Sequence, residues 1–381
     1  MTVSDFQRKM CDILNFGALN LAMAIGYKHG IFEAMDAIGD YAPVDTISRK
    51  SGLDPRYIRE WLGVMATGGI VEISWREEIS RGHEISGKDE ISRGQAREEL
   101  YRLPEEHAAL LTRGAGAANL GVYTQEIPLL TCCAMDAVEK GFKSGEGIPF
   151  SFYPSFQSFM SQISNAKHRD VLVDKFLPQV DGGRILAGLE KGIRVCDIGC
   201  GEGVALNLMA QSFPKSGFTG IDNDPDAIET ARNSTRDMGL GNVAYLIEDA
   251  ALVGEMDDFK NRFDYITAFD AIHDQTRPLE TLKGIRKMLA NPGVFSMVDI
   301  NAGSSHHDNI HHPMGPFLYT VSLMHCMPVG LGEDGRGSGL GMMWGRERAL
   351  ELLGEAGFTH VDILEMAHDG FNVHYQCKLN F

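Results

Sequence analysis

The stretch 194–203, R-V-C-D-I-G-C-G-E-G, constrains the fold of this chain more than any other. An apolar, strand-like run ends at Asp197, and glycines follow at Gly199, Gly201 and Gly203 before a helical pattern begins. A glycine-rich turn between a strand and a helix lets a ligand approach the backbone closely. The third glycine comes one residue early for the dinucleotide pattern G-x-G-x-x-G, so the spacing disfavours a nicotinamide dehydrogenase.

Two later apolar runs also end in acidic residues. Asp222 closes the run G-F-T-G-I-D and is followed by Asn223, whereas Asp249 and Ala250 close the run V-A-Y-L-I-E-D-A. An acidic residue about 20 positions after a glycine-rich loop suits the two hydroxyls of a ribose. The three strand ends together indicate a Rossmann-like domain that binds a nucleoside at one edge of its sheet.

In this order, the three strand ends resemble the cofactor motifs of class I S-adenosylmethionine-dependent methyltransferases. In that family the glycine loop passes under the methionine part of the cofactor. The first later acid takes the ribose hydroxyls, and the second takes the adenine amino group. The resemblance implies S-adenosylmethionine (SAM) as the cofactor, with binding residues Asp197, Gly199, Cys200, Gly201, Asp222, Asn223, Asp249, Ala250, Phe269 and Asp270. Related enzymes also close an aromatic side chain over the cofactor, and Tyr153 in the aromatic-rich segment 151–160 is our candidate.

Strand-like and helix-like patterns alternate from about residue 193 onwards. Such alternation predicts an α/β fold with a mostly parallel sheet and helices on both faces. Only a short turn separates the last two runs, so we expect an antiparallel pair at the sheet edge. The resulting prediction for 191–381 is a seven-stranded Rossmann-like methyltransferase sheet with its last strand antiparallel. The strands are expected at 194–198, 217–222, 243–248, 264–269, 293–300, 360–366 and 373–379.

The N-terminal part has a different pattern. Residues 44–73 read as helix, turn, helix, turn and strand, which predicts a winged helix-turn-helix within residues 1–110. We expect an extended wing at 75–99, where short E-I-S units repeat over 78–94 and indicate an elongated hairpin or insertion. Residues 111–190 are predicted to be a helical linker and cofactor lid.

Such a module can bind DNA, which leaves a winged-helix regulator with a methyltransferase fold as an alternative function. In front of many small-molecule methyltransferases, the same module serves dimerisation and covers the substrate. The net charge of −17 opposes nucleic-acid binding, because that binding neutralises phosphates. The run 19–35 is more apolar than a small winged helix can hide, so we expect a homodimer through the N-terminal domain.

The expected cellular compartment follows from three sequence features: apolar stretches, the N-terminal residues and the cysteines. No stretch approaches the about 18 consecutive apolar residues of a membrane span, and the first residues lack the apolar core of a secretory signal. The seven cysteines form no C-x-x-C pair, which is typical of reduced thiols in the cytosol. We therefore expect a cytoplasmic protein that does not bind membranes.

The fourth strand run is followed by A-I-H-D-Q-T-R-P, which places His273 and Asp274 where ligands of open parallel sheets bind. Histidine is the side chain best suited to take a proton near neutral pH. We predict that His273 is the catalytic base and that Asp274 assists it; alternatively, His273 stacks on adenine or caps the next helix. The N-P-P-Y-like turn of enzymes that methylate amino groups of nucleic acids is missing here. We expect a small-molecule acceptor bearing oxygen, nitrogen or sulfur.

After the fifth strand run come four histidines, His306, His307, His311 and His312. Helical spacing of two of them would suit a metal, but Gly303 and Pro313 leave little room for a helix. We interpret them as solvated or pocket-lining residues and expect no metal site. Weaker candidates for the substrate pocket are Tyr319, His325 and Met327.

Further segments extend the resemblance over nearly the whole chain. They include A-I-G-Y-K-H-G-I-F, Y-R-L-P-E-E-H-A-A-L-L, D-A-I-H-D-Q, P-F-L-Y-T-V-S-L-M-H-C-M and G-L-G-M-M-W-G. Together they look like a group of winged-helix class I methyltransferases best known from mycobacteria. The wing repeat and H-H-D-N-I-H-H depart from that pattern, so the resemblance does not name a substrate.

Overall fold

The computed structural model describes residues 2–77 and 97–379, which form two compact units, Met1–Pro128 and Leu129–Phe381. The predicted N-terminal domain 1–110 lies within the first unit, and the predicted methyltransferase domain 191–381 lies within the second. The boundary divides the segment 111–190, of which the larger part belongs to the second unit.

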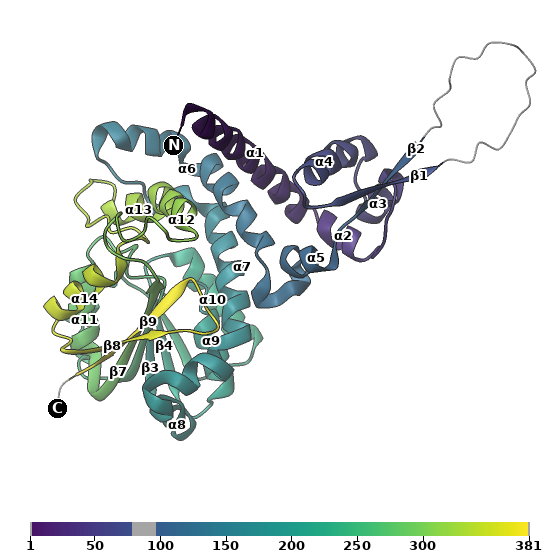
Figure 1. The fold of residues 1–381 in the computed structure, drawn as a ribbon. Helices are drawn as coiled ribbons and strands as arrows, with labels where there is room; N and C mark the ends of the chain where they lie inside the picture. The colour runs from purple at the N-terminus through teal and green to yellow at the C-terminus, as the bar shows by residue number, and fades with distance from the viewer. Residues whose placement is uncertain (1, 78–96, 380–381) are drawn as a thin grey trace, which may run out of the picture. The chain divides into compact units, whose positions relative to one another are not determined.

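The first unit contains the predicted helix-turn-helix and hairpin (Figure 1). Gly52, with φ +72°, ends the first helix of the pair, and the Asp54 side chain caps the second by accepting the backbone N–H groups of Arg56 and Tyr57. Such a cap satisfies N–H groups that have no partner within the helix. The elements are α1 (Val3–Lys28), α2 (Ile31–Asp36), α3 (Val44–Ser51), α4 (Pro55–Thr67), β1 (Glu72–Glu77), β2 (Arg97–Arg102), α5 (Glu105–Leu111), η1 (Arg113–Ala118) and η2 (Gly121–Gln125).

The wing strands β1 and β2 pair antiparallel, with Glu72 opposite Arg102. Two ion pairs on exposed side chains join the strands, Arg102 with Glu72 and Arg76 with Glu98. The repeat at 78–94, and with it most of the predicted wing 75–99, lies outside the described residues.

Helix α1 begins earlier than the sequence pattern indicated. Thr2 and Asp5 form a capping box at its start, because each side chain bonds the other residue's backbone N–H. The apolar run 19–35 is also not one helix, since Gly30 adopts φ +69° and separates α1 from α2. A left-handed residue cannot continue a right-handed helix.

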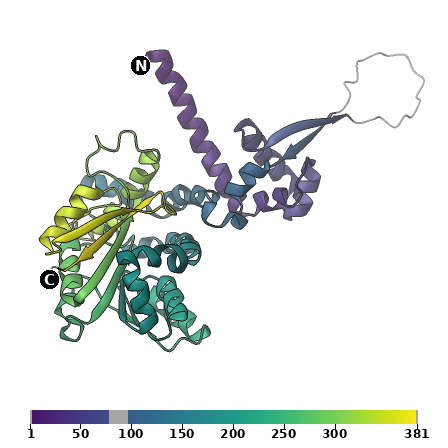
Figure 2. The same ribbon diagram turned by 60° about the horizontal axis from the view of Figure 1, so that its bottom comes forward.

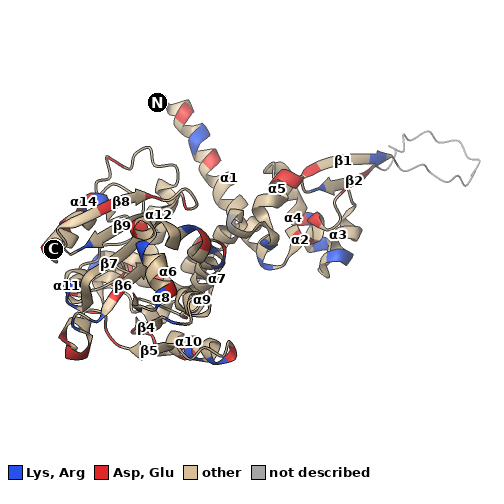
Figure 3. Ribbon diagram, turned by 90° about the horizontal axis from the view of Figure 1, so that it is seen from below, with Lys and Arg blue, Asp and Glu red and all other residues tan. Residues whose placement is uncertain are grey.

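In Figure 3 the ribbon of α1 is mostly tan beyond its N-terminal end, and one long face of this helix carries exposed apolar side chains. They recur at helical spacing and are Val3, Phe6, Met10, Ile13, Leu14, Leu21 and Ile25. The charged residues of this helix gather toward its N-terminal end, apart from Lys28. Among the described residues, α1 is the single helix that is long and apolar enough to cross a membrane, a test that core helices of soluble proteins also pass.

The second unit is built on a seven-stranded sheet with the order β5-β4-β3-β6-β7-β9-β8. The first five strands run parallel, and β9 lies antiparallel between β7 and β8, which confirms the predicted fold class and its antiparallel last strand. Each strand lies within a few residues of its expected position. The strands are β3 (Arg194–Ile198), β4 (Gly217–Asp222), β5 (Val243–Ile247), β6 (Phe263–Phe269), β7 (Leu289–Ile300), β8 (His360–Glu365) and β9 (Asn372–Lys378).

Helices cover both faces of this sheet (Figure 2). On one face, α11 (Pro278–Met288) and α14 (Gly345–Glu355) pack apolar side chains onto β6, β7 and β9. On the other face, α8 (Arg184–Lys191), α9 (Val204–Ser212) and α10 (Pro225–Asp237) pack onto β3, β4 and β5. The strands of a sheet enclosed in this way are apolar almost throughout. A charged residue inside one of these strands therefore needs a specific partner and is a candidate for a functional role.

Three further groups of helices and helical turns complete the second unit. Before the sheet come α6 (Glu126–Ser144), η3 (Phe150–Phe152), α7 (Pro154–Val171), the π-turn η4 (Leu172–Phe176) and η5 (Leu177–Gly183). Between β5 and β6 lie the short turns η6 (Val253–Glu255) and η7 (Asp257–Phe259). Between β7 and α14 lie α12 (Gly315–Val321), the π-turn η8 (Ser322–Cys326) and α13 (Met327–Leu331). The site described next is made where η3, α7 and η8 meet the ends of β6 and β7.

Candidate active site

The glycine loop after β3 is tied to the end of β4. The backbone N–H groups of Gly199 and Cys200 donate to the Ile221 carbonyl at 2.9 and 3.2 Å. The Asp222 carboxylate accepts the N–H of Gly201 at 2.8 Å and that of Asp224 at 3.0 Å. Burial is the main cause that raises the pKa of Asp222, and these backbone N–H groups act against it. The structure thus brings the predicted loop and the predicted ribose-binding acid into direct contact.

Two glycines of the loop have opposite surroundings. Gly201 has φ +51°, and a methyl group added there would meet no atom within 4 Å. Gly203 has φ +72°, and a methyl group there would lie 2.2 Å from the hydroxyl oxygen of Tyr245. Gly201 therefore leaves open space beside the backbone, as a ligand cradle requires, whereas Gly203 allows close packing at the start of α9.

Asp197 at the end of β3 is a buried acid with few partners. Its carboxylate accepts the hydroxyl of Thr267 at 2.6 Å, and its exposed fraction is 3%. Burial raises its pKa to about 7, with a smaller contribution from the negative charge of Asp222. A buried carboxylate with too little charge compensation is suited to a cationic group. The amino group and sulfonium of SAM are cations, so this acid and the open Gly201 fit that cofactor.

The two residues predicted for adenine lie side by side. Asp249 accepts the N–H of Ala251 at 2.8 Å and the guanidinium of Arg277 at 2.6 Å. Ala250 is buried and packs with the core beneath β4, while Asn223 after β4 is exposed. Asp249 therefore keeps a solvent-accessible carboxylate whose orientation is fixed by Arg277.

Phe269 and Asp270 end β6 on the face covered by α7 and η4. The Phe269 ring lies 5.0 Å from that of His168, centroid to centroid. Asp270 has φ +50°, and both its carboxylate oxygens accept the Asn372 side-chain amide at 3.0 Å. Burial raises the pKa of Asp270 to about 6. The structure points this acid toward β9 and fixes it there.

His273 is buried and is held by a residue that the sequence reading missed. Its Nδ1 donates to the Asp299 carboxylate at 2.8 Å, and its Nε2 lies 3.4 Å from Asp274 Oδ1. Burial lowers the pKa of His273, but the negative charges of Asp299 and Asp274 outweigh that effect and raise it well above its ordinary value. In the neutral form of the ring, the bond to Asp299 holds the proton on Nδ1, so that Nε2 carries the lone pair.

A second histidine lies next to this pair. His325 is buried among aromatic rings, with Tyr153 and Phe156 both at a centroid distance of 4.6 Å. Burial lowers its pKa. The Tyr153 hydroxyl donates to the Met324 carbonyl at 2.8 Å, so this predicted lid residue is fully buried against η8. Cys326 follows, and burial raises the pKa of its thiol to about 12.

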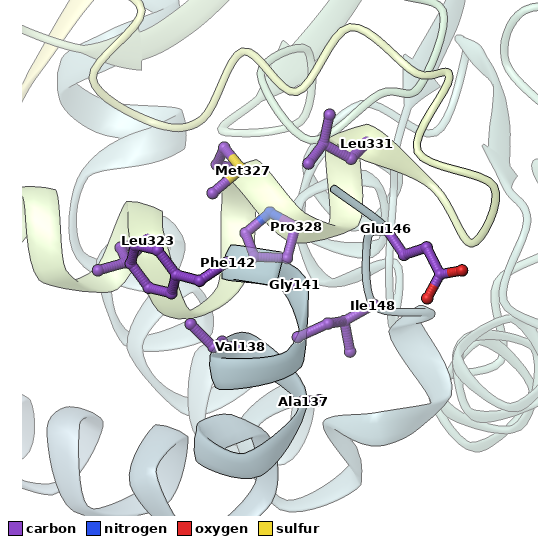
Figure 4. Close-up of a pocket in the computed structure, with 10 residues that line it drawn as sticks. All are labelled: Ala137, Val138, Gly141, Phe142, Glu146, Ile148, Leu323, Met327, Pro328 and Leu331. Carbon is purple, nitrogen blue, oxygen red and sulfur yellow. The ribbon is translucent and has the colours of Figure 1, made fainter. Parts of the chain in front are cut away.

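An apolar cavity of about 170 Å³ lies beside η8 (Figure 4). Side chains of α6 form one wall, and Met327 with its neighbours in η8 and α13 forms the other. The carboxylate of Glu146 lies at its edge. The lining residues are Ala137, Val138, Gly141, Phe142, Glu146, Ile148, Leu323, Met327, Pro328 and Leu331.

Other candidates from the sequence lie apart from this cluster. The hydroxyl of Tyr319 accepts the Asn309 side-chain amide at 3.0 Å, and its ring packs near Ile300 and Leu318. The segment with the four histidines forms turns rather than a helix, and the side chain of His307 is 93% exposed. The histidine cluster is therefore not assembled into one site.

Asp299 and Cys326 were missed, although Asp299 is the next-to-last residue of the expected strand 293–300 and Cys326 lies in the quoted segment P-F-L-Y-T-V-S-L-M-H-C-M. Asp299 interrupts the apolar run F-S-M-V-D-I near the end of β7, and it is fully buried. A charged residue inside a strand covered on both faces needs a partner, and that rule could have found it. Cys326 carried no such signal, since an isolated cysteine is usually a small core residue.

Comparisons with known proteins agree with the methyltransferase fold. A family model described as a methyltransferase domain matches residues 189–318, and a model described as an Rv2258c-like winged HTH domain matches residues 17–80. Several curated relatives match, of which two are described here. One is an uncharacterized protein of Rickettsia prowazekii, 28% identical over 110 residues, which are 28% of this chain and 42% of the relative. The other is the aklanonic acid methyltransferase DauC of a Streptomyces species, 37% identical over 86 residues, which are 22% of this chain and 38% of the relative. The chain thus spans about two fifths of the length of each.

Similar solved structures extend over the full length. Human N-acetylserotonin methyltransferase in complex with SAM has a TM-score of 0.67 at 13% identity, with 100% of both chains covered. The mitomycin 7-O-methyltransferase MmcR has a TM-score of 0.63 at 15% identity, covering 99% of this chain and 98% of its own. At such identities the likeness establishes the fold.

The fold is that of class I methyltransferases, a class of enzymes that use SAM. Residues 189–318 match a methyltransferase domain, and residues 17–80, which precede it, match an Rv2258c-like winged HTH domain. This confirms the class of protein predicted from the sequence.

Proposed function

We propose that this protein transfers a methyl group from SAM to an oxygen, nitrogen or sulfur atom of a small molecule. The observation that carries the proposal is the group of carboxylates around the glycine loop. Asp197 and Asp222 end neighbouring strands, and the open face of Gly201 lies between them. When bound, SAM supplies an activated methyl group and its own leaving group, so the protein must mainly align the reactants.

The proposed cofactor contacts follow the strand order. The Asp197 carboxylate holds the positive charge of the methionine part beside Gly199, Cys200 and Gly201. Asp222 accepts the ribose hydroxyls. Asp249, with Asn223 and Ala250 nearby, lies on the adenine side. Tyr153, Phe269 and Asp270 are the remaining proposed cofactor contacts.

The proposed base is the Nε2 nitrogen of His273. Asp299 accepts the proton on Nδ1 and stabilises the imidazolium that forms when Nε2 takes a proton from the acceptor. Asp274 lies on the Nε2 side and orients the acceptor group. Because the pair is buried, water is excluded from the point of proton transfer.

We propose a small, largely apolar acceptor. The cavity beside η8 is lined almost entirely by apolar side chains, and it begins at Leu323 and Met327, which flank His325 and Cys326 in the chain. Such a pocket suits the apolar body of a substrate whose polar group lies at the histidines. The names of the relatives, aklanonic acid and mitomycin methyltransferases, are compatible with acceptors of this kind.

Calorimetry tests the cofactor assignment directly. SAM and S-adenosylhomocysteine should each bind at one site per chain, and NAD should not bind. A panel of phenols, carboxylates, amines and thiols, assayed for release of S-adenosylhomocysteine, then identifies the acceptor class. Binding of NAD alone would contradict the proposal, and retention of DNA at physiological salt would favour the regulator instead.

We further propose a cytoplasmic homodimer that does not bind nucleic acid or membranes. The apolar face of α1 supports the dimer, because a long exposed stripe of this kind normally lies in an interface. All seven cysteines are free, which suits a reducing compartment.

A further inference from the structure

Three potential metal ligands of different chemistry converge at the proposed base and include it. His273 Nε2, Asp274 Oδ1 and Cys326 Sγ all lie within 4.8 Å of one another. The first two come from the loop after β6, and the third ends η8. Imidazole nitrogen, thiolate sulfur and carboxylate oxygen are the three donor types that zinc takes in proteins.

The distance between two of these donors matches a tetrahedral metal site. Zinc binds imidazole nitrogen and carboxylate oxygen at about 2.0–2.2 Å, so two such ligands of a tetrahedral ion lie roughly 3.4 Å apart. His273 Nε2 and Asp274 Oδ1 are 3.4 Å apart. An ordinary hydrogen bond between these atoms would be shorter. The Cys326 sulfur lies within 4.8 Å of both of these atoms.

The surroundings of His273 are those of a metal-binding histidine. Ligand histidines normally donate their second nitrogen to a carboxylate, which fixes the ring and makes the ligand nitrogen more basic. Asp299 is that carboxylate partner, because its Oδ1 lies 2.8 Å from His273 Nδ1. The arrangement directs the lone pair of Nε2 away from Asp299 and toward Asp274.

An unsatisfied buried atom points the same way. Asp274 Oδ1 is shielded from solvent and accepts no hydrogen bond from the described residues; its nearest charged neighbour is His273 Nε2, at the long distance of 3.4 Å. Buried polar atoms nearly always have a partner, and a bare carboxylate oxygen in such a place is costly. A cation held by this oxygen would remove that cost.

We propose that His273, Asp274 and Cys326 bind one zinc ion, and that this ion inhibits methyl transfer. Nε2 has a single lone pair, so it cannot both ligate zinc and accept a proton. The thiol of Cys326 releases its proton to solvent when it binds, which makes zinc affinity rise with pH. The inhibitory part rests on the function proposed above, whereas the binding part does not.

Metal binding is tested without any substrate. Zinc added to the full-length protein should bind at one site per chain in competition with a chromophoric chelator. Cobalt(II) should give a sulfur-to-metal charge-transfer band and the absorption of a tetrahedral ion. Cys326→Ser should abolish that band. Asp299→Asn, which alters only the outer partner, should weaken zinc binding about 10- to 100-fold.

The exposed histidines provide the matched control. A double variant, His307→Ala with His311→Ala, should bind zinc as tightly as the unchanged protein, because these side chains lie apart from the trio. Binding lost in that double variant but kept in Cys326→Ser would overturn the proposal. Retained binding of S-adenosylhomocysteine by Cys326→Ser shows that this variant is folded.

Inhibition is tested once an acceptor is known. Zinc should lower turnover, a chelator should restore it, and Cys326→Ser should be less sensitive to zinc than the unchanged protein. Zinc that raises turnover, or leaves it unchanged at full occupancy, contradicts inhibition. A protein that binds zinc at the trio but does not bind SAM would refute the proposed function and leave the metal site standing.

Discussion

At the scale of single residues, the site is a set of acids whose environments differ. Asp249 is partly exposed and paired with Arg277, whereas Asp197 is buried with one hydroxyl partner. Asp299 is buried and paired with His273. The proposed roles of these acids, to contact adenine, to attract a cation and to stabilise an imidazolium, therefore differ with burial and partner.

Cofactor binding should depend on pH through Asp197. Its pKa of about 7 means that roughly half of the free protein carries a neutral acid at neutral pH. Only the ionised form attracts a cation, so affinity for S-adenosylhomocysteine should rise between pH 6 and pH 8, by up to about tenfold per unit below the pKa. Three other titratable groups face Asp197. They are the carboxyl of Asp222, whose pKa is also raised, and the thiols of Cys196 and Cys200.

Calorimetry across this pH range measures the effect. Asp197→Asn should bind weakly at every pH and lose most of the dependence. Asp226→Asn, a change at an exposed acid in the first turn of α10, should keep it. An affinity that is flat with pH in the unchanged protein would show that Asp197 does not contact the charged part of the cofactor.

Removal of the proposed base should slow the reaction and spare the cofactor. A general base contributes about 10²- to 10⁴-fold, so His273→Ala should lower turnover by that factor for an acceptor that must lose a proton. Its affinity for S-adenosylhomocysteine should change little. His307→Ala, at an exposed histidine, is the control.

The alternatives give different outcomes. Turnover within a few-fold of the unchanged protein means that alignment alone drives the reaction and His273 shapes the pocket. A collapse of cofactor affinity places the histidine on the adenine side.

At the scale of elements, one strand–loop–helix unit organises the cofactor site. β3, the glycine loop and α9 are consecutive, and the loop joins β4 through Asp222. Glycine occurs there for two separate reasons, open space at Gly201 and close packing at Gly203. The two reasons can be separated by one substitution each.

Gly201→Ala and Gly203→Ala should therefore fail in different ways. Both force alanine into the left-handed region, at a cost of about 1–2 kcal/mol. At Gly203 the added methyl group also overlaps Tyr245, and overpacking of that kind adds roughly 1–3 kcal/mol. Gly203→Ala should thus be clearly the less stable in thermal or urea unfolding.

Gly201→Ala should fold well but bind S-adenosylhomocysteine poorly, because its methyl group occupies the cradle. If both variants bind the cofactor normally once folded, the loop does not approach the ligand.

At the scale of the whole molecule, the exposed apolar face of α1 is the surface that most needs a partner. Its apolar side chains recur every three to four residues, and a solvated helix would not keep such a stripe. A second copy of the chain can cover this face by symmetry. The described residues of this face include Ile13 and Leu14, both close to half exposed or more.

Light scattering should give the mass of a dimer at micromolar concentration. Ile13→Glu with Leu14→Glu should produce a monomer, because two buried charges would face each other across the interface. Tyr57→Glu, at an exposed apolar residue of α4, should leave the dimer intact. A monomeric unchanged protein contradicts the dimer, and capture of the protein by lipid vesicles would point to a membrane surface.

The sequence by itself determined what depends on local pattern. Strand and helix periodicity predicted the seven strands, and the strand-end motifs predicted Asp197, Asp222 and Asp249, because parallel strands bring their carboxyl ends to one edge. Tertiary structure alone decided what depends on distant pairing. Asp299 is 26 positions from His273 in the chain, and Cys326 and Tyr153 come from other segments. No periodicity records such contacts, since they arise only when the sheet and its covering helices pack.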